Sequence, residues 1–253
     1  MKTKTNRFIR AASILLVFFL VSCAANLELR KNRGEAFRNL GEGYMGQRDY
    51  TTALRELLKA EKLYSKDPRL QNDLGLTYMA KGKPDIAIDH FKKAITIKPD
   101  YTPAKNNMGT AYLAKKDWDR AITCFKEITE DLTYATPHYP LSNLGWAYYN
   151  KKQYDLAEKY YQDALKIEPR FAIALSGLGR TYIAMGKISD AIATFEKAVK
   201  IFPGFAELYL DLADAYRLSR EYKKALDAYS KVIELAPDSP IAIEAQKEMA
   251  RIR

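Results

Sequence analysis

The sequence predicts an all-α protein, a solenoid in which six similar pairs of helices stack one against the next. The same residue types return about every 34 residues, and prolines end most of the copies. The composition also suits amphipathic helices, with 28% charged residues, 10 prolines, 12 glycines and 18 tyrosines among 253 residues. A unit this short buries its apolar face only against its neighbours, so repeated copies stack into an elongated array.

Four kinds of position define the period. A tyrosine recurs at Tyr44, Tyr78, Tyr112, Tyr148, Tyr182 and Tyr216, and three residues earlier stand Gly41, Gly75, Gly109, Gly145, Gly179 and Ala213. An alanine follows at Ala53, Ala87, Ala121, Ala157, Ala191 and Ala225, and a large apolar residue at Leu57, Phe91, Phe125, Tyr161, Phe195 and Tyr229. Small residues allow two helices to cross closely, the large side chains fill the space beside them, and proline stops the second helix. The pattern therefore predicts one helical pair for each copy.

This pattern resembles the tetratricopeptide repeat, which carries leucine-glycine, tyrosine, alanine, phenylalanine, alanine and proline at fixed places over 34 residues. The resemblance implies a right-handed α-solenoid of six repeats over residues 34–238. Residues 239–253 are expected to form a capping helix, because apolar residues recur at helical spacing from Pro240 to Ile252 beside a charged face.

The first 22 residues read as a signal peptide. A positive segment from Lys2 to Arg10 precedes an apolar stretch from Ala11 to Val21, which is too short to span a bilayer as a helix. Leu20-Val21-Ser22-Cys23 resembles the bacterial lipobox, which implies cleavage before Cys23 and attachment of a lipid to its thiol. Residues 23–33 would then be the lipidated cysteine and a short extended tether. The alternatives are a plain secretory signal and a membrane helix that happens to end in cysteine.

The basic charge of the chain is not a strong sign of a polyanionic partner. Removal of four cations with the signal peptide lowers the net charge from +10 to +6. The remaining excess is spread over helix surfaces without a dense basic run, which favours a solvated surface over nucleic-acid binding. Attraction to anionic lipid or cell-wall polymer stays open. Cys124 is the single cysteine left, and we expect it to be a buried, small apolar residue.

The resemblance to tetratricopeptide repeats places a binding groove on the first helix of each repeat. The expected lining residues are Asn72, Leu76, Met79, Asn106, Thr110, Leu113, Tyr139, Trp146, Tyr149, Ile173, Arg180 and Ile183. Charged residues are scarce among these positions, and an exposed neutral strip indicates a surface that binds another polypeptide. Trp146 and Tyr149 are the expected anchors, because aromatic residues dominate binding energy at interfaces. The alternative is that these side chains are partly buried against each other.

One use of such repeats is excluded by the residues present. The clamp that holds a chaperone's terminal carboxylate needs Lys, Asn, Asn, Lys and Arg at set positions. The corresponding positions here are Arg38, Glu42, Asp73, Pro103 and Asn107. Acidic residues therefore stand where the clamp requires cations or amides.

Between the third and fourth repeats the period lengthens to 36 residues, which predicts a longer loop at 129–140. This loop carries Asp131 and the run Tyr134-Ala135-Thr136-Pro137 before Asn143-Leu144-Gly145. With six repeats and a lipobox, it resembles the Tgl/PilF/PilW family of type IV pilus lipoproteins. The resemblance implies an outer-membrane pilotin that faces the periplasm, binds a secretin subunit and promotes its ring assembly. Ala24, where aspartate would favour retention in the inner membrane of enteric bacteria, agrees with that location.

The sequence offers little for catalysis. His90 and His138 are the two histidines, one expected at an exposed helical position and the other in the longer loop. No familiar catalytic motif is present, so we predict neither an enzyme nor a metal or cofactor site. Two alternatives to a pilotin remain, namely a scaffold for cell-wall enzymes or other envelope assembly, and an envelope enzyme.

Overall fold

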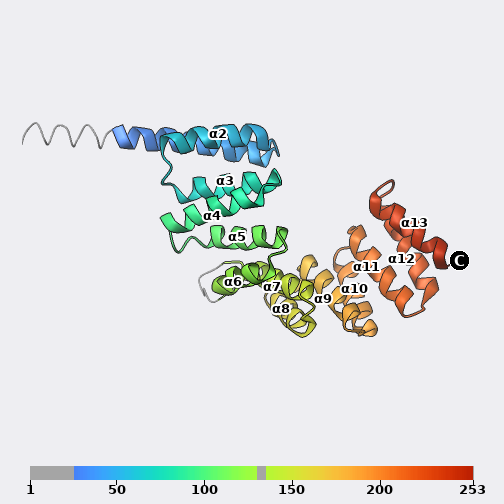
Figure 1. Ribbon diagram of the computed structural model, residues 1–253. Helices are drawn as coiled ribbons and strands as arrows, with labels where there is room; N and C mark the ends of the chain where they lie inside the picture. The colour runs from blue at the N-terminus through green and yellow to red at the C-terminus, as the bar shows by residue number, and fades with distance from the viewer. Residues whose placement is uncertain (1–25, 130–134, 253) are drawn as a thin grey trace, which may run out of the picture. The chain divides into compact units, whose positions relative to one another are not determined.

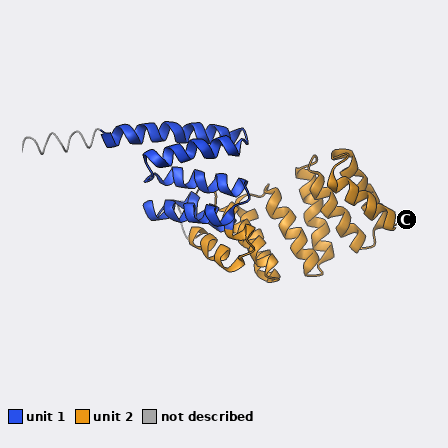
Figure 2. Ribbon diagram, turned by 45° about the horizontal axis from the view of Figure 1, so that its top comes forward, with its two compact units in different colours: residues 1–111 blue, residues 112–253 orange. Residues whose placement is uncertain are grey.

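The computed structural model describes residues 26–129 and 135–252, and Figure 1 shows helices joined by short turns. No strand occurs among the described residues, which confirms the predicted all-α class. The chain divides into two compact units, residues 1–111 and 112–253 (Figure 2).

The described part of unit 1 starts within a helix, which covers residues 26–46. The following helices are α2 (Tyr50–Leu63), α3 (Pro68–Ala80), α4 (Pro84–Ile97) and α5 (Thr102–Ala114), within which unit 1 ends. Helix α3 packs against both α2 and α4. Part of the core consists of Leu57, Leu70 and Leu74, all essentially buried, with Phe37 and Tyr78 packed against them.

Unit 2 continues the alternation of first and second helices. Its helices are α6 (Trp118–Thr129), α7 (His138–Asn150), α8 (Tyr154–Ile167), α9 (Ala172–Ala184), α10 (Ile188–Ile201), α11 (Ala206–Leu218), α12 (Tyr222–Leu235) and α13 (Pro240–Ile252). Helix α13 covers the residues predicted for the capping helix and packs against α12. The longer loop predicted at 129–140 includes residues 130–134, which lie outside the described residues.

The packing within unit 2 places the first helices of successive repeats side by side. Each helix from α6 to α13 contacts the next one along the chain, and α7 also contacts α9, α9 contacts α11, and α11 contacts α13. The side chains that α7, α9, α11 and α13 direct away from the second helices therefore share one surface. The capping helix α13 occupies the place of a first helix in this layer.

In four repeats the glycine of the first helix, at Gly41, Gly75, Gly145 or Gly179, lies where a large side chain crosses it. A Cβ atom added to Gly75 would lie 2.4 Å from Cε1 of Phe91, and one added to Gly179 would lie 2.4 Å from Cζ of Phe195. Both rings are fully buried. Contacts this short cannot be relieved in a close-packed interior without moving the ring or the helix. The close helix crossing predicted from the repeat pattern is confirmed at these positions.

A left-handed residue ends the first helix of every repeat. The positions with positive φ recur with the period of the sequence, at Arg48, Gly82, Lys116, Lys152, Gly186 and Arg220. In each case the next backbone N–H donates to the carbonyl of the repeat tyrosine, as Lys83 N does to Tyr78 O at 2.9 Å. This is the Schellman arrangement, which satisfies backbone groups that a helix end leaves unpaired. Only two of the six turns use glycine, although glycine adopts this conformation most easily.

The predicted tether is wrong from residue 26 onward, because residues 26–33 belong to the first helix. Good helix formers such as Leu27, Leu29 and Arg30 fill this stretch. Lys31 also pairs with Glu28 one turn away, at 3.9 Å. Farther along, Gly34 is buried near Leu63 of α2 and near Tyr64, the residue that follows α2. Local helix propensity and packing against α2 therefore extend the helix beyond the start of the repeat pattern.

Candidate binding site

The candidate site lies on the surface that the first helices of unit 2 share. A pocket of about 400 Å³ opens between α7, α9 and the start of α11. Trp146, Ile173 and Arg180 line it, and the side chain of Ile173 is 62% exposed and that of Trp146 40% exposed. We call this the Trp146 pocket. Three of the residues predicted from the sequence are therefore brought together here.

A second pocket of about 480 Å³ adjoins the first, since Arg180 and Glu207 line both. We call it the Tyr149 pocket, and it runs from α7 and α9 to α11 and α13. Tyr149 and Ile183 line it, as predicted. The Tyr149 ring stacks on that of Trp146, with centroids 5.9 Å apart and an angle of 9° between the rings. The two aromatic residues expected as anchors thus form one stacked pair at the junction of the pockets.

The wall of the Trp146 pocket also holds a polar group without a partner. Ser142 is 2% exposed, and its hydroxyl makes no hydrogen bond with any described residue. Buried hydroxyl groups normally have a partner, because an unmade hydrogen bond costs about 1–3 kcal/mol. The hydroxyl oxygen is closed to solvent in this conformation, so a polypeptide in the pocket would bond to it only after the Ser142 side chain rotates.

Arg180 is not a free cation. Its Nε lies 2.9 Å from Oδ1 of Asp211, and the Ser176 hydroxyl donates to Oδ2 of the same carboxylate at 2.8 Å. Burial raises the pKa of Asp211, whereas the guanidinium of Arg180 and the hydroxyl of Ser176 act in the opposite direction. The pair fixes the guanidinium between the two pockets and leaves it little net charge for a ligand.

Two predicted groove residues of unit 2 do not line these pockets. Tyr139 is 47% exposed but packs near His138 and Phe171, with ring centroids 4.5 and 5.1 Å away. Leu113 is half-buried on α5. Both therefore lie outside the two pockets, and their part in a binding groove stays a prediction.

Sequence profiles described as tetratricopeptide repeat match residues 68–101 and 139–171, residues 107–131 and residues 176–240. The chain carries tetratricopeptide repeats. No curated protein matches it by sequence.

Several solved tetratricopeptide-repeat structures have a similar fold. PilW, described as a widely conserved type IV pilus biogenesis factor, is 24% identical with a TM-score of 0.78, and the match covers 84% of this chain and 98% of PilW. Pseudomonas aeruginosa PilF is 18% identical with a TM-score of 0.72, over 87% of this chain and 99% of PilF. YrrB, described as having an unusual peptide-binding site, is 20% identical with a TM-score of 0.55, over 76% of this chain and 97% of YrrB. At these identities the likeness shows the shared fold.

The repeats of unit 1 hold the other five predicted groove residues. Asn72 is buried, and its Oδ1 accepts a hydrogen bond from Nδ2 of Asn107 at 2.8 Å, so it links α3 to α5. Leu76 and Met79 are half-buried on α3. Thr110 is exposed, and its hydroxyl donates to the backbone oxygen of Asn106 at 3.1 Å. The amide of Asn72 is therefore engaged inside the protein, whereas Thr110 stays accessible.

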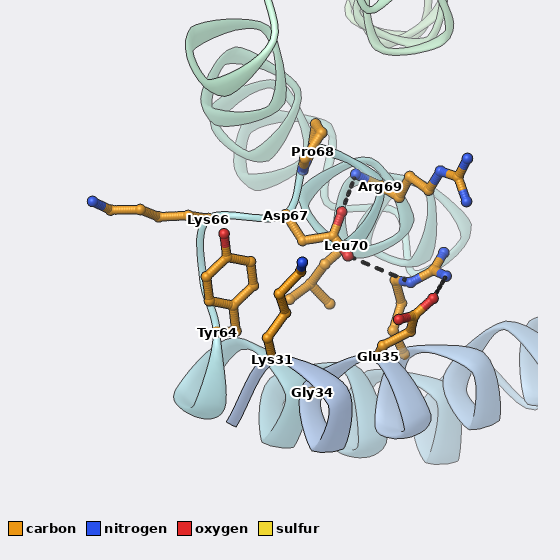
Figure 3. A pocket seen from close by; sticks show the side chains of 10 residues that line it. Lys31, Gly34, Glu35, Tyr64, Lys66, Asp67, Pro68, Arg69 and Leu70 are labelled. Atoms are coloured by element: carbon orange, nitrogen blue, oxygen red, sulfur yellow. Dashed lines mark hydrogen bonds and ion pairs between the residues drawn. The ribbon is translucent and has the colours of Figure 1, made fainter. Parts of the chain in front are cut away.

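A charged pocket of about 340 Å³ in unit 1 was not predicted (Figure 3). Arg38 is a buried residue of its lining, 3.5 Å from Asp67, 3.7 Å from Asp73, 3.8 Å from Glu42 and 3.9 Å from Glu35. Burial raises the pKa of Asp73 to about 6, although Arg38 acts to lower it. The repeat pattern marks these positions as polar but contains no signal for their pairing.

The histidines of the repeats do not have the surroundings of a catalytic pair. We expected His90 to be exposed, but it is buried. Its Nδ1 lies 2.8 Å from Oε1 of Gln71, and its ring stacks on that of Tyr78. Burial lowers the pKa of His90. Cys124 is buried as expected, and burial raises the pKa of its thiol to about 11. Within the described part of the chain, no group of three or more His, Cys, Asp or Glu side chains could hold a metal ion.

The predicted lipid site at Cys23 and the signal peptide at 1–22 lie outside the described residues. Among the residues that are described, no helix combines the length and apolar character needed to span a membrane. Ser142, Phe205 and Glu207 also line the pockets, although none of them was among the expected groove residues. Repeat position alone could have identified Glu207 as a lining residue, because it stands at a first-helix position of the sixth repeat.

Proposed function

We propose that the chain binds a segment of another envelope polypeptide in the Trp146 and Tyr149 pockets of unit 2. The observation that carries this proposal is the exposed Trp146 and Ile173 in a pocket that also contains the unpaired hydroxyl of Ser142. Large apolar side chains together with a few polar groups are typical of recognition sites. Tetratricopeptide repeats generally serve as binding surfaces, and the role proposed here is likewise non-catalytic.

We further propose that the partner is a secretin subunit and that the chain acts as a pilotin in type IV pilus biogenesis. The fold is shared with PilW, a type IV pilus biogenesis factor, and with PilF, over nearly the whole length of each. The chain would accompany the secretin to the outer membrane and promote its assembly into a ring. The groove supports this role because it offers a surface for one segment of a larger protein.

Substitution of Trp146 by alanine tests the binding surface. The mature protein and the W146A variant would be cross-linked in membranes and recovered, and the amount of captured secretin would be measured. We expect at least a roughly tenfold loss of capture, because aromatic anchors at the centre of an interface commonly contribute more than about 2 kcal/mol.

The matched control is Tyr222→Ala, since Tyr222 is 48% exposed on α12 and lines neither pocket. Capture by this variant should equal that of the unmodified protein. Undiminished capture by the W146A variant would place the binding site elsewhere. If the unmodified protein recovers cell-wall enzymes and no secretin, the scaffold role replaces the pilotin role.

We also propose that a lipid on Cys23 holds the chain at the periplasmic face of the outer membrane. A Cys23→Ser variant whose residues 1–22 are replaced by a secretory signal peptide that is cleaved without lipidation should move from the membrane fraction to the soluble periplasmic fraction, because it lacks the acyl chains that attach the protein stably. Fractionation followed by immunoblotting measures this. A serine variant that remains membrane-bound would contradict the lipid anchor.

A further inference from the structure

The Tyr149 pocket carries excess negative charge in a chain whose net charge is +10. Its carboxylates outnumber its guanidinium groups by four to two. The charged lining residues are Glu207, Asp211, Asp214, Glu244, Arg180 and Arg217. A pocket of this sign in a basic protein indicates a ligand of opposite charge.

The two arginines are engaged by neighbouring carboxylates. Arg180 pairs with Asp211 at 2.9 Å, as described above. Arg217 lies 3.6 Å from Asp214 and 3.7 Å from Glu248. These pairs hold the guanidinium groups in place and neutralise much of their charge.

Glu207 and Glu244 provide the charge that remains. Both side chains are exposed, and neither forms an ion pair with another residue in the described ranges 26–129 and 135–252. Glu207 stands at the start of α11 and lines both pockets, whereas Glu244 lies on α13. Carboxylates in a pocket with apolar walls attract cations more strongly than the same groups on an open surface.

The uncharged part of the Tyr149 pocket suits the stem of a long cationic side chain. Ile183, Leu218 and Ile241 line it, and Leu218 is 45% exposed. The methylene groups of lysine or arginine can cover such surface while the charged end stays near carboxylates. The ring of Tyr149 adds a face on which a cation is attracted.

We propose that this surface recognises a polypeptide segment that carries an apolar side chain and, close to it, an arginine or lysine. The apolar side chain enters the Trp146 pocket, and the cationic side chain enters the Tyr149 pocket between Glu207 and Glu244. This inference rests on the proposed binding function of unit 2 and specifies the chemistry of the partner. It does not depend on the partner being a secretin.

Synthetic peptides with a neutral fluorescent label test the inference. Ten-residue peptides in a Gly/Ser background would carry one leucine and one arginine, separated by one to five residues. Matched peptides would carry leucine with glutamate, or serine with arginine. Binding to the full mature chain in detergent would be measured by fluorescence anisotropy, at low and at high salt.

At least one Leu/Arg spacing should bind about tenfold more tightly than its Leu/Glu counterpart at low salt, as expected for two partly exposed ion pairs. The double variant Glu207→Gln with Glu244→Gln should abolish this preference and flatten the salt dependence. The double variant Glu127→Gln with Asp227→Asn changes the charge equally at exposed positions outside both pockets, and it should retain the preference.

Equal binding of Leu/Arg and Leu/Glu peptides, or no Leu/Arg binding up to millimolar concentration, would overturn the inference. Secretin capture that depends on Trp146 but not on Glu207 and Glu244 would overturn it while leaving the proposed function intact. Loss of the peptide preference in the glutamine variant, without any effect of W146A on secretin capture, would support the inference and reject the pilotin partner. If sedimentation shows that the glutamine variant changes only self-association, a second copy of the chain is the occupant and the inference fails.

Discussion

Glycine in the first helix of a repeat is required by the ring that lies over it. At Gly75 the position of a Cβ atom is 2.4 Å from the Phe91 ring, which is fully buried between helices. The Gly75→Ala substitution should lower the free energy of unfolding by roughly 1–3 kcal/mol, the usual cost of overpacking a core. Urea denaturation followed by circular dichroism measures this difference.

Gly43 provides a control within the same unit, because nothing lies within 4 Å of a Cβ atom added there. Gly43→Ala should leave stability unchanged or raise it by up to about 1 kcal/mol, since alanine favours a helix over glycine. In the G75A background, Phe91→Leu should cost less than it does alone. Equal costs would contradict the overlap as the cause.

The buried Arg38 cluster predicts a pH dependence that is specific to Asp73. The pKa of this carboxyl group is raised to about 6 in the folded state, chiefly by burial, whereas an unfolded Asp titrates near 3.9. The folded state therefore holds the proton more tightly, and stability contributed below pH 4 is lost as pH rises through 6. Ionised Asp73 destabilises the fold at neutral pH.

Asp73→Asn removes this titration. The free energy of unfolding of the variant minus that of the unmodified protein should rise by on the order of 2 kcal/mol between pH 4 and pH 7. Other carboxylates titrate in both proteins and cancel in the difference. Urea denaturation at several pH values measures it, and a difference that stays constant with pH would refute the shifted pKa.

At the scale of elements, the turn after each first helix requires a residue with positive φ, and only some repeats place a glycine there. Lys152 has φ of 59° and Gly186, at the same place in the next repeat, has φ of 75°. Steric strain makes this conformation about 1–2 kcal/mol less favourable for a residue with a Cβ atom than for glycine. Part of that difference is offset, because glycine loses more conformational entropy on folding. Lys152→Gly should therefore raise the free energy of unfolding by about 0.5–1 kcal/mol, measured by urea denaturation.

The reciprocal substitution provides the control for this turn. Gly186→Lys places a long side chain in the same conformation and should lower stability by a similar amount. Opposite signs at two equivalent turns would be difficult to obtain from any cause other than backbone conformation. Two changes of the same sign would show that other contacts of these residues dominate.

At the scale of the whole molecule, the helical array was predictable because small, aromatic and proline residues recur at fixed distances. These residues determine where helices cross and turn, and both are local consequences of side-chain size and backbone conformation. The pockets were predictable only in part. Trp146 and Ile173 could be placed from repeat position alone, because first helices present equivalent positions to one surface.

The remaining features depend on distances between residues far apart in the sequence. Arg38 contacts carboxylates from its own helix, from α3 and from the turn between α2 and α3. His90 contacts Gln71, nineteen residues earlier. Long polar side chains reach several neighbours, so the repeat period alone does not select one pairing. The contribution of α13 to the Tyr149 pocket was missed for a related reason, because a capping helix was expected only to cover a core.

The early start of the first helix has a consequence for how the molecule would stand on a bilayer. If Cys23 carries a lipid, it lies only three positions before residue 26, the first residue that the structure describes, which is already helical. Eight residues advance about 12 Å along a helix, less than half their extended length. The link between the lipid and the repeats would then be short, and the protein would bind its partner close to the lipid headgroups.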